Sequence, residues 1–192
     1  KLRGYVGLTM DMATQPDKVL KACEALAPHL CHVGLTTADP AGQVPIGFWM
    51  HRGCVPFVSP KTFDTHYWPT LKPIIEEFWK HGHQTLFYAE GKWAYHFDTF
   101  RELPDRSIVF HCDRDDIFHA HRKLHDKFCL SGGIPNVMLS FGRPGEVRRR
   151  LQERQGDRHR LRRPLPEQVP DGRGLRRRRR LRRHGPLLRV PA

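Results

Sequence analysis

Imidazole and carboxylate side chains stand at the ends of three short apolar segments of the sequence. His51 follows the first segment, Glu90 follows the second, and His111 with Asp113 follows the third. Imidazoles and carboxylates are common general acids and bases, because their surroundings can bring their pKa values close to the working pH. We predict that Glu90, His51 and His111 are catalytic, with Glu90 acting as a general base or an oxygen ligand. Asp113 is predicted to contact the substrate.

Four further residues around these groups suit substrate binding. Phe48 and Tyr88 lie within apolar segments and are predicted to line a pocket, while Gly132 and Gly133 follow a fourth apolar segment. A glycine pair lets a bulky ligand approach the backbone closely, because glycine has no Cβ. A structural role stays open for each of these residues: packing for Tyr88, helix capping for Asp113, a carboxylate saturated by loop amides at Glu90, and loop hydrogen bonds for the histidines.

Several neighbours of these residues receive a structural interpretation. Carboxylates favour helix amino termini, so Asp115 and Asp116 are expected to cap a helix that begins there. Cys112 follows His111 directly, and adjacent strand residues point to opposite faces, which predicts burial of Cys112 behind its strand. Packing in the core or between helices is expected for four aromatic residues: Trp49, Trp68, Trp79 and Phe78.

Strands that alternate with helices are expected to position these residues. Short apolar segments predict strands at 46–50, 85–89, 107–110 and 128–130, and helical spacing predicts helices at 16–33, 59–82, 93–103 and 115–125, with another after Pro135. The helix at 59–82 is expected to break, because it contains Pro69 and Pro73. This alternation predicts an α/β fold with about four βα units of a parallel (β/α)8 barrel, whose chemistry lies at the carboxyl ends of the strands.

The charge of the chain changes abruptly near residue 147. Residues 1–146 are electrically neutral, and the whole formal net charge of +13 belongs to residues 147–192, which contain 17 Arg and no Lys, Ser, Thr or aromatic residue. Such a composition predicts disorder. Every residue type present can be written with a codon that starts in C or G, so we interpret the tail as a frameshifted, non-native sequence. A genuine basic arm that binds nucleic acid is the alternative.

Cysteine usage and hydropathy exclude two classes of protein. The five cysteines are odd in number, contain no CxxC pair and all precede residue 147, which argues against a disulfide framework or a zinc ribbon. No apolar run approaches the roughly 18 residues needed to span a bilayer. The expected setting is the cytoplasm, without a membrane partner.

Residues 3–146 resemble the uroporphyrinogen decarboxylase superfamily, which includes the haem-pathway decarboxylase and corrinoid-dependent methyltransferases. The segment FWMHRG at 48–53 looks like the decarboxylase stretch FESHAG, and VSPKTF at 58–63 with YWP at 67–69 is similar to the family pattern SPxxF…YWP. The segment LSGGIPNVMLSFGRPGEV at 130–147 looks like GNxPxxLLxxGTPEEV. The resemblance implies a TIM barrel and a tetrapyrrole-linked substrate.

The sequence departs from the characterised branches of this family. Where the thiol methyltransferases carry the zinc-binding HxCG, this chain reads Tyr88-Ala89-Glu90-Gly91, so no metal site is predicted. Met50 replaces a substrate-contacting serine of the decarboxylase, and the family's amino-terminal arginine and aspartate are expected upstream of Lys1. The resemblance implies either porphyrinogen decarboxylation or methyl transfer with a corrinoid carried by a separate protein, and no cofactor bound to this chain.

These observations lead to one expected function and one alternative. We expect an enzyme fragment that is inactive by itself, because half a barrel leaves exposed edge strands. The alternative is a non-enzymatic protein that binds nucleic acid through residues 148–189.

Overall fold

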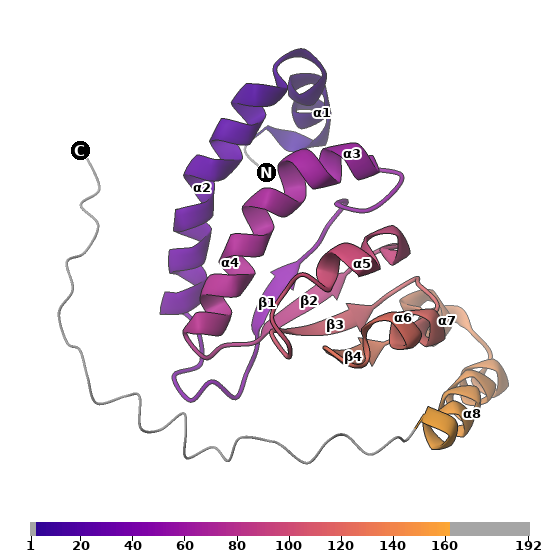
Figure 1. Cartoon of the computed structure of the whole chain (residues 1–192). Helices are drawn as coiled ribbons and strands as arrows, with labels where there is room; N and C mark the ends of the chain where they lie inside the picture. Colours follow the sequence, from indigo (N-terminus) through magenta and orange to yellow (C-terminus); the bar gives the residue numbers. More distant parts are fainter. Residues whose placement is uncertain (1–2, 162–192) are drawn as a thin grey trace. The chain divides into compact units, whose positions relative to one another are not determined.

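Four parallel strands form one sheet, in the order in which they occur in the sequence (Figure 1). The computed structural model describes residues 3–161, with side chains as far as residue 152. The strands are β1 (Ile46–Trp49), β2 (Thr85–Ala89), β3 (Ile108–Cys112) and β4 (Cys129–Gly132). Each pairs in parallel with the next, so the chain is an α/β protein whose predicted strands are all confirmed.

Helices connect the strands as the sequence predicts. The helical elements are α1 (Gly4–Thr14), α2 (Pro16–Thr36), α3 (Pro60–Thr62), the π-helical turn η1 (Phe63–Tyr67), α4 (Trp68–Lys80), the 3-10 turn η2 (Ala94–His96), α5 (Phe97–Phe100), α6 (Ile117–Leu124), α7 (Asn136–Phe141) and α8 (Pro144–Leu161). The predicted helix at 59–82 is broken, because η1 separates α3 from α4 and Pro69 lies in the first turn of α4. The sequence did not predict α1.

The motif residues before α4 have local structural roles. Ser59 caps α3, since its side chain accepts a hydrogen bond from the amide of Thr62 at 3.1 Å. Phe63 and Trp68 are buried, and Tyr67 donates to the sulfur of Met50 at 3.7 Å. Desolvation raises the pKa of the Tyr67 hydroxyl. This segment therefore packs against the end of β1, directly before His51.

One face of the sheet is buried against helices. Thr85, Phe87 and Ala89 alternate with half-buried residues along β2, and β3 repeats the pattern with Ile108, Phe110 and Cys112. The buried residues pack against an aromatic cluster from α5 and the preceding segments: Phe63, Trp68, Trp93, Phe97 and Phe100. Burial of Cys112 behind its strand is thus confirmed. Trp68 and Phe78 are also buried, as predicted.

The other face of the sheet carries a different set of side chains, because strand residues alternate between the two faces. The register places Gly47, Leu86, Val109 and Cys129 in one row across the four strands. The next row holds Trp49, Tyr88, His111 and Ser131. We call this the open face, because Trp49 is 63% exposed and Tyr88 and His111 are only half-buried.

Helix α8 begins before residue 147, where the disordered tail is predicted to start, and continues beyond it. The helix runs from Pro144 to Leu161, so it includes the first part of the segment whose composition predicts disorder. Arg, Leu, Gln and Glu are among the better helix formers, and Pro144 begins the helix with a dihedral angle that suits its first turn. The rest of the predicted tail, residues 162–192, lies outside the described residues. Within the described part of the chain, no helix is both long enough and apolar enough to cross a membrane.

Candidate active site at the carboxyl ends of the strands

A row of three aromatic rings crosses the open face near the carboxyl ends of the strands. The Trp49 and Tyr88 rings stack at 4.8 Å between centroids, and the Tyr88 and His111 rings stack at 4.7 Å. Ser131 continues the row, with its hydroxyl 3.2 Å from Nδ1 of His111. Because the rings stack on one another, their edges are the parts left to meet a ligand. In the described part of the chain, the Trp49 indole N–H and the Tyr88 hydroxyl have no hydrogen-bond partner.

A contact between the side chains of His51 and Glu90 lies beside this row, just beyond the carboxyl ends of β1 and β2. His51 Nδ1 contacts Glu90 Oε2, and the His51 ring also stacks on Trp49 at 5.5 Å. Both side chains are about half exposed, at 59% for His51 and 49% for Glu90. The carboxylate of Glu90 is therefore not saturated by loop amides, which was the structural alternative for this residue. The structure brings together His51, Glu90, Tyr88 and His111, four of the predicted site residues.

Two carboxylates after β3 hold the loop that carries Glu90. Asp113 accepts a hydrogen bond from the amide of Gly91 at 2.9 Å. Asp115 accepts from the amides of Trp93 at 2.6 Å and Ala94 at 3.1 Å. These three hydrogen bonds join residues 21 or 22 positions apart. They tie the end of β2 to the end of β3, and Asp113 thereby positions the peptide next to Glu90.

The two aspartates predicted as helix caps have different roles. Asp116 caps α6 as expected, accepting from the amide of Phe118 at 3.0 Å. The capping prediction is wrong for Asp115, whose acceptor atoms are engaged by the preceding loop. Burial raises the pKa of the Asp115 carboxyl despite the two amide donors.

The loop conformation after Glu90 depends on glycine. Gly91 has a φ of +97°, and a Cβ at this position would lie 2.6 Å from Sγ of Cys54. The Cys54 thiol itself donates toward the carbonyl of Glu90 at 3.5 Å, and the Trp93 indole donates to the same carbonyl at 2.8 Å. Desolvation raises the pKa of the Cys54 thiol. Both faces of this peptide are thus packed, and the Glu90 backbone is fixed.

The glycine pair after β4 lies against protein rather than open space. A Cβ on Gly132 would lie 2.3 Å from the carbonyl oxygen of Cys112, and one on Gly133 would lie 2.7 Å from Cβ of Ile117. Both glycines have positive φ values, at +79° and +83°. Packing of the β4 turn against β3 and α6 accounts for this pair. Substrate contact by Gly132 and Gly133 stays a prediction.

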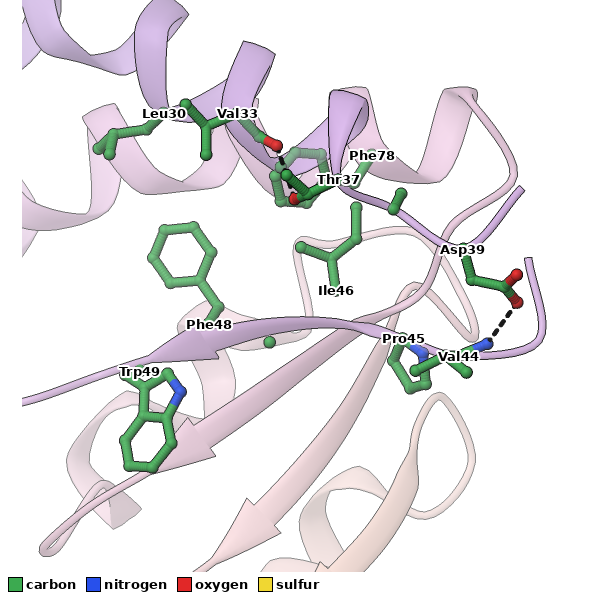
Figure 2. A pocket seen from close by; sticks show the side chains of 13 residues that line it. Leu30, Val33, Thr37, Asp39, Val44, Pro45, Ile46, Phe48, Trp49 and Phe78 are labelled. Carbon is green, nitrogen blue, oxygen red and sulfur yellow. Dashed lines mark hydrogen bonds between the residues drawn. The ribbon is translucent and has the colours of Figure 1, made fainter. Parts of the chain in front are cut away.

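Phe48 lies on the opposite side of the sheet from the aromatic row. Figure 2 shows Phe48 pointing toward α2 and α4, with Trp49 on the other side of the strand. Phe48 lines an apolar cavity of about 480 Å³ together with Leu30, Val33 and Phe78. The structure therefore separates Phe48 from the other predicted site residues. The packing prediction was wrong for Trp49, which stacks on the open face instead.

Burial affects the protonation of His111. Desolvation lowers the pKa of its imidazole, while the nearby charge of Asp113 acts in the opposite direction and is the smaller influence. His111 is therefore held mainly neutral near pH 7, since an unperturbed histidine has a pKa of about 6.5. If the Ser131 hydroxyl donates to Nδ1, the ring proton resides on Nε2 and points away from Ser131. Such an imidazole can donate one hydrogen bond to a ligand over the open face.

The arrangement combines hydrogen-bond donors with a group that can exchange a proton. The indole, phenol and imidazole edges can donate to an anionic or carbonyl oxygen. His51, oriented by Glu90, can give or accept a proton through its second ring nitrogen. Among the described residues, no group of three or more His, Cys, Asp or Glu side chains is arranged to hold a metal ion.

Sequence reasoning missed Trp49 and Ser131 as members of this site. The signal was present, because Trp49 precedes His51 by two residues and positions i and i+2 of a strand share a face. Ser131 could not be found in this way, since its place beside His111 depends on the register of β4 against β3. Comparisons of the chain with protein-family models, curated proteins and solved structures found no match.

The packing around Gly91 leads to a stability prediction. The substitution Gly91→Ala adds a Cβ both in a positive-φ conformation and against Cys54, whereas Gly82→Ala adds one at φ +85° with no atom within 4 Å. We expect Gly91→Ala to lower the free energy of unfolding by about 1–3 kcal/mol more than Gly82→Ala, because overpacking adds to strain. Urea denaturation of both variants measures the difference. Equal losses would show that Cys54 does not constrain this loop.

The neutral state of His111 leads to a pH prediction. A histidine whose pKa is lowered by folding binds its proton more readily in the unfolded chain, so the free energy of unfolding should fall as the pH drops below about 6.5. The variant His111→Gln should lose this component while keeping a polar side chain of similar size. Denaturation of both proteins between pH 7 and about 5 tests the difference. Parallel pH profiles would contradict the prediction.

Proposed function

We propose that this chain is part of a (β/α)8 barrel enzyme of the uroporphyrinogen decarboxylase superfamily, with its site on the open face at the carboxyl ends of the strands. The observation that carries the proposal is the convergence of the Trp49–Tyr88–His111 row with the His51–Glu90 pair. These groups come from three consecutive parallel strands and the residues that follow them. In barrels of this kind the chemistry lies at that end of the sheet.

The chemistry of the side chains suits a tetrapyrrole-linked reaction. A porphyrinogen carries carboxylates that can accept from the Trp49 and Tyr88 edges, and decarboxylation requires a proton to replace the lost carbon dioxide. His51, oriented by Glu90, is the group placed to supply it. In a methyl transfer, His51, Glu90 and His111 would hold the substrate while a separate corrinoid protein docks over the open face. Both reactions follow from the family resemblance, although Met50 in place of the substrate-contacting serine argues against porphyrinogen decarboxylation.

Ligand binding is the appropriate test, because the four strands of the described residues do not close a barrel within one copy of the chain, and we expect no turnover by a single copy. Uroporphyrin, a planar tetrapyrrole acid, should quench the tryptophan fluorescence of the 192-residue protein. The double variant His51→Ala/Glu90→Gln should weaken this binding about tenfold or more, since hydrogen bonds to charged groups contribute about 1.5–3 kcal/mol. Hydroxocobalamin serves as the second probe and represents the methyl-transfer reaction.

A second His–Glu pair in the molecule provides a matched control. His81 and Glu77 form an exposed pair at 3.5 Å near the end of α4, away from the strand carboxyl ends. His81→Ala/Glu77→Gln should leave binding unchanged. Absence of binding by the unmodified protein to either probe would refute the proposal, as would equal weakening by both double variants.

The charge of the chain favours a second candidate function. All of the +13 net charge belongs to residues 147–192, so a genuine tail would bind nucleic acid electrostatically. Gel-shift titrations with RNA should then show affinity that falls steeply with added salt. Replacing the five arginines at 176–180 with Gln should reduce the salt slope by roughly 3.5–4.5, at about 0.7–0.9 per lost phosphate contact. Salt-insensitive binding, or a slope unchanged by the replacement, would reject this function.

A further inference from the structure

Both outer edges of the sheet are unpaired in the described part of the chain. The strand order β1-β2-β3-β4 leaves β1 and β4 with one neighbour each. All four strands run in the same direction, and each edge strand is four residues long. An edge strand with free amides and carbonyls is a template for pairing with another strand.

The backbone groups that face outward can be identified from the observed hydrogen bonds. The amide of Ile46 donates to the carbonyl of Gln84, which precedes β2, at 2.8 Å, and the amide of Met50 donates to the carbonyl of Tyr88 in β2 at 3.1 Å. Alternate strand residues bond to opposite sides, so the amides of Gly47 and Trp49 face the free edge of β1. The amide of Gly133 donates to Cys112 at 2.7 Å, which by the same alternation turns the Leu130 and Gly132 amides toward the free edge of β4.

Large apolar side chains are exposed beside both of these edges. Next to β1, Leu30, Val33 and Trp49 are each more than half exposed, and the apolar cavity of Figure 2 opens between α2 and the strand. Beyond β4, the helix α7 exposes Val137, Leu139 and, at 86%, Phe141. Exposed apolar groups gathered at particular edges mark surfaces that associate. Here they lie beside the two strands that lack a partner.

We infer that a second copy of this chain pairs with these edges, β4 of each copy lying parallel to β1 of the other, so that the two sheets form one closed eight-stranded barrel. The inference rests on the proposed barrel. Two unlike edges on one molecule form a head-to-tail interface, which closes into a ring when the rotation allows it. A two-fold axis along the barrel keeps all strands parallel. Eight strands enclose an interior that side chains just fill.

Closure by a second copy would also complete the candidate site. The aromatic row ends at Trp49 on the β1 edge and at Ser131 on the β4 edge. In the two-copy barrel each row continues onto the β1 or β4 residues of the partner. Trp49, which is 63% exposed in the single chain, would be enclosed. A substrate pocket would then have walls on both sides, formed by two identical sets of donors.

Sedimentation equilibrium of the 192-residue protein at high salt tests the inference. The expected mass is twice the 22.4 kDa of the single chain. Gly47→Pro removes an outward amide without removing a hydrogen bond to β2, so it should return the mass to that of the single chain. Gly47→Ala keeps the amide and should remain a dimer. Acrylamide quenching of Trp49, isolated by comparison with Trp49→Phe, should decrease as the dimer forms.

Three results on the mass of the protein would overturn the inference. A single-chain mass for the unmodified protein excludes pairing, a dimer insensitive to Gly47→Pro excludes the β1 edge, and masses that grow beyond the dimer exclude closure. If circular dichroism shows Gly47→Pro to be unfolded, Trp49 in a dimer of the unmodified protein must still be shielded from acrylamide. The mass is measured without ligand and is therefore independent of the binding test. A protein that stays a single chain but binds uroporphyrin would overturn this inference and leave the proposed function standing. A dimer that binds neither tetrapyrrole probe overturns only the proposed function.

Discussion

Phe87 and Phe110 stack at 5.7 Å between the centre of the sheet and the helices that follow β2 and β3, and both rings touch Phe100. This contact between two strands and one helix decides which face of the sheet is buried. Side chains along a strand point to alternate faces of the sheet. Burial of Phe87 and Phe110 on one face therefore by itself places Tyr88 and His111 on the opposite face. A register slip of one residue would exchange the two sets. The candidate site is thus a geometric consequence of the aromatic core beneath it.

The loops at the carboxyl ends are held by fewer interactions, and these are mostly polar. Asp113 and Asp115 bind backbone amides of the loop after β2, and the Glu90 carbonyl receives the Trp93 indole. Such charge-assisted bonds to backbone donors are strong and directional. They fix the peptide from which the Glu90 side chain projects. The aromatic core therefore orders the strands, and these carboxylates order the acid–base group above them.

The cavity beside β1 lies between the strand and α2, and it reaches Trp49 of the candidate site at the edge of the sheet. Phe48 and Trp49 are adjacent in the sequence and both border the apolar cavity, but only Trp49 also stacks on Tyr88. Both residues reach the edge of the sheet that lacks a neighbour. The apolar cavity and the end of the aromatic row therefore meet at this edge of the sheet. A further strand paired with β1 would cover both.

Local patterns in the sequence determined the four strands, the main helices between them and the positions of His51, Glu90 and His111 at strand ends. Apolar segments, proline positions and glycine stops report on the residues that carry them. The helical segment from Ser59 to Lys80 is broken as predicted, but the break lies at 63–67, before Pro69, and α4 continues through Pro73. Only the tertiary structure decided that Trp49 joins the site while Phe48 leaves it, and that Asp115 holds a distant loop instead of capping its own helix. These outcomes depend on strand register and on partners more than twenty residues away, as in the bond from the Trp93 amide to Asp115. A short-range sequence pattern cannot predict such partners. It also cannot predict which face of a sheet is buried, because that depends on the elements that pack against the sheet.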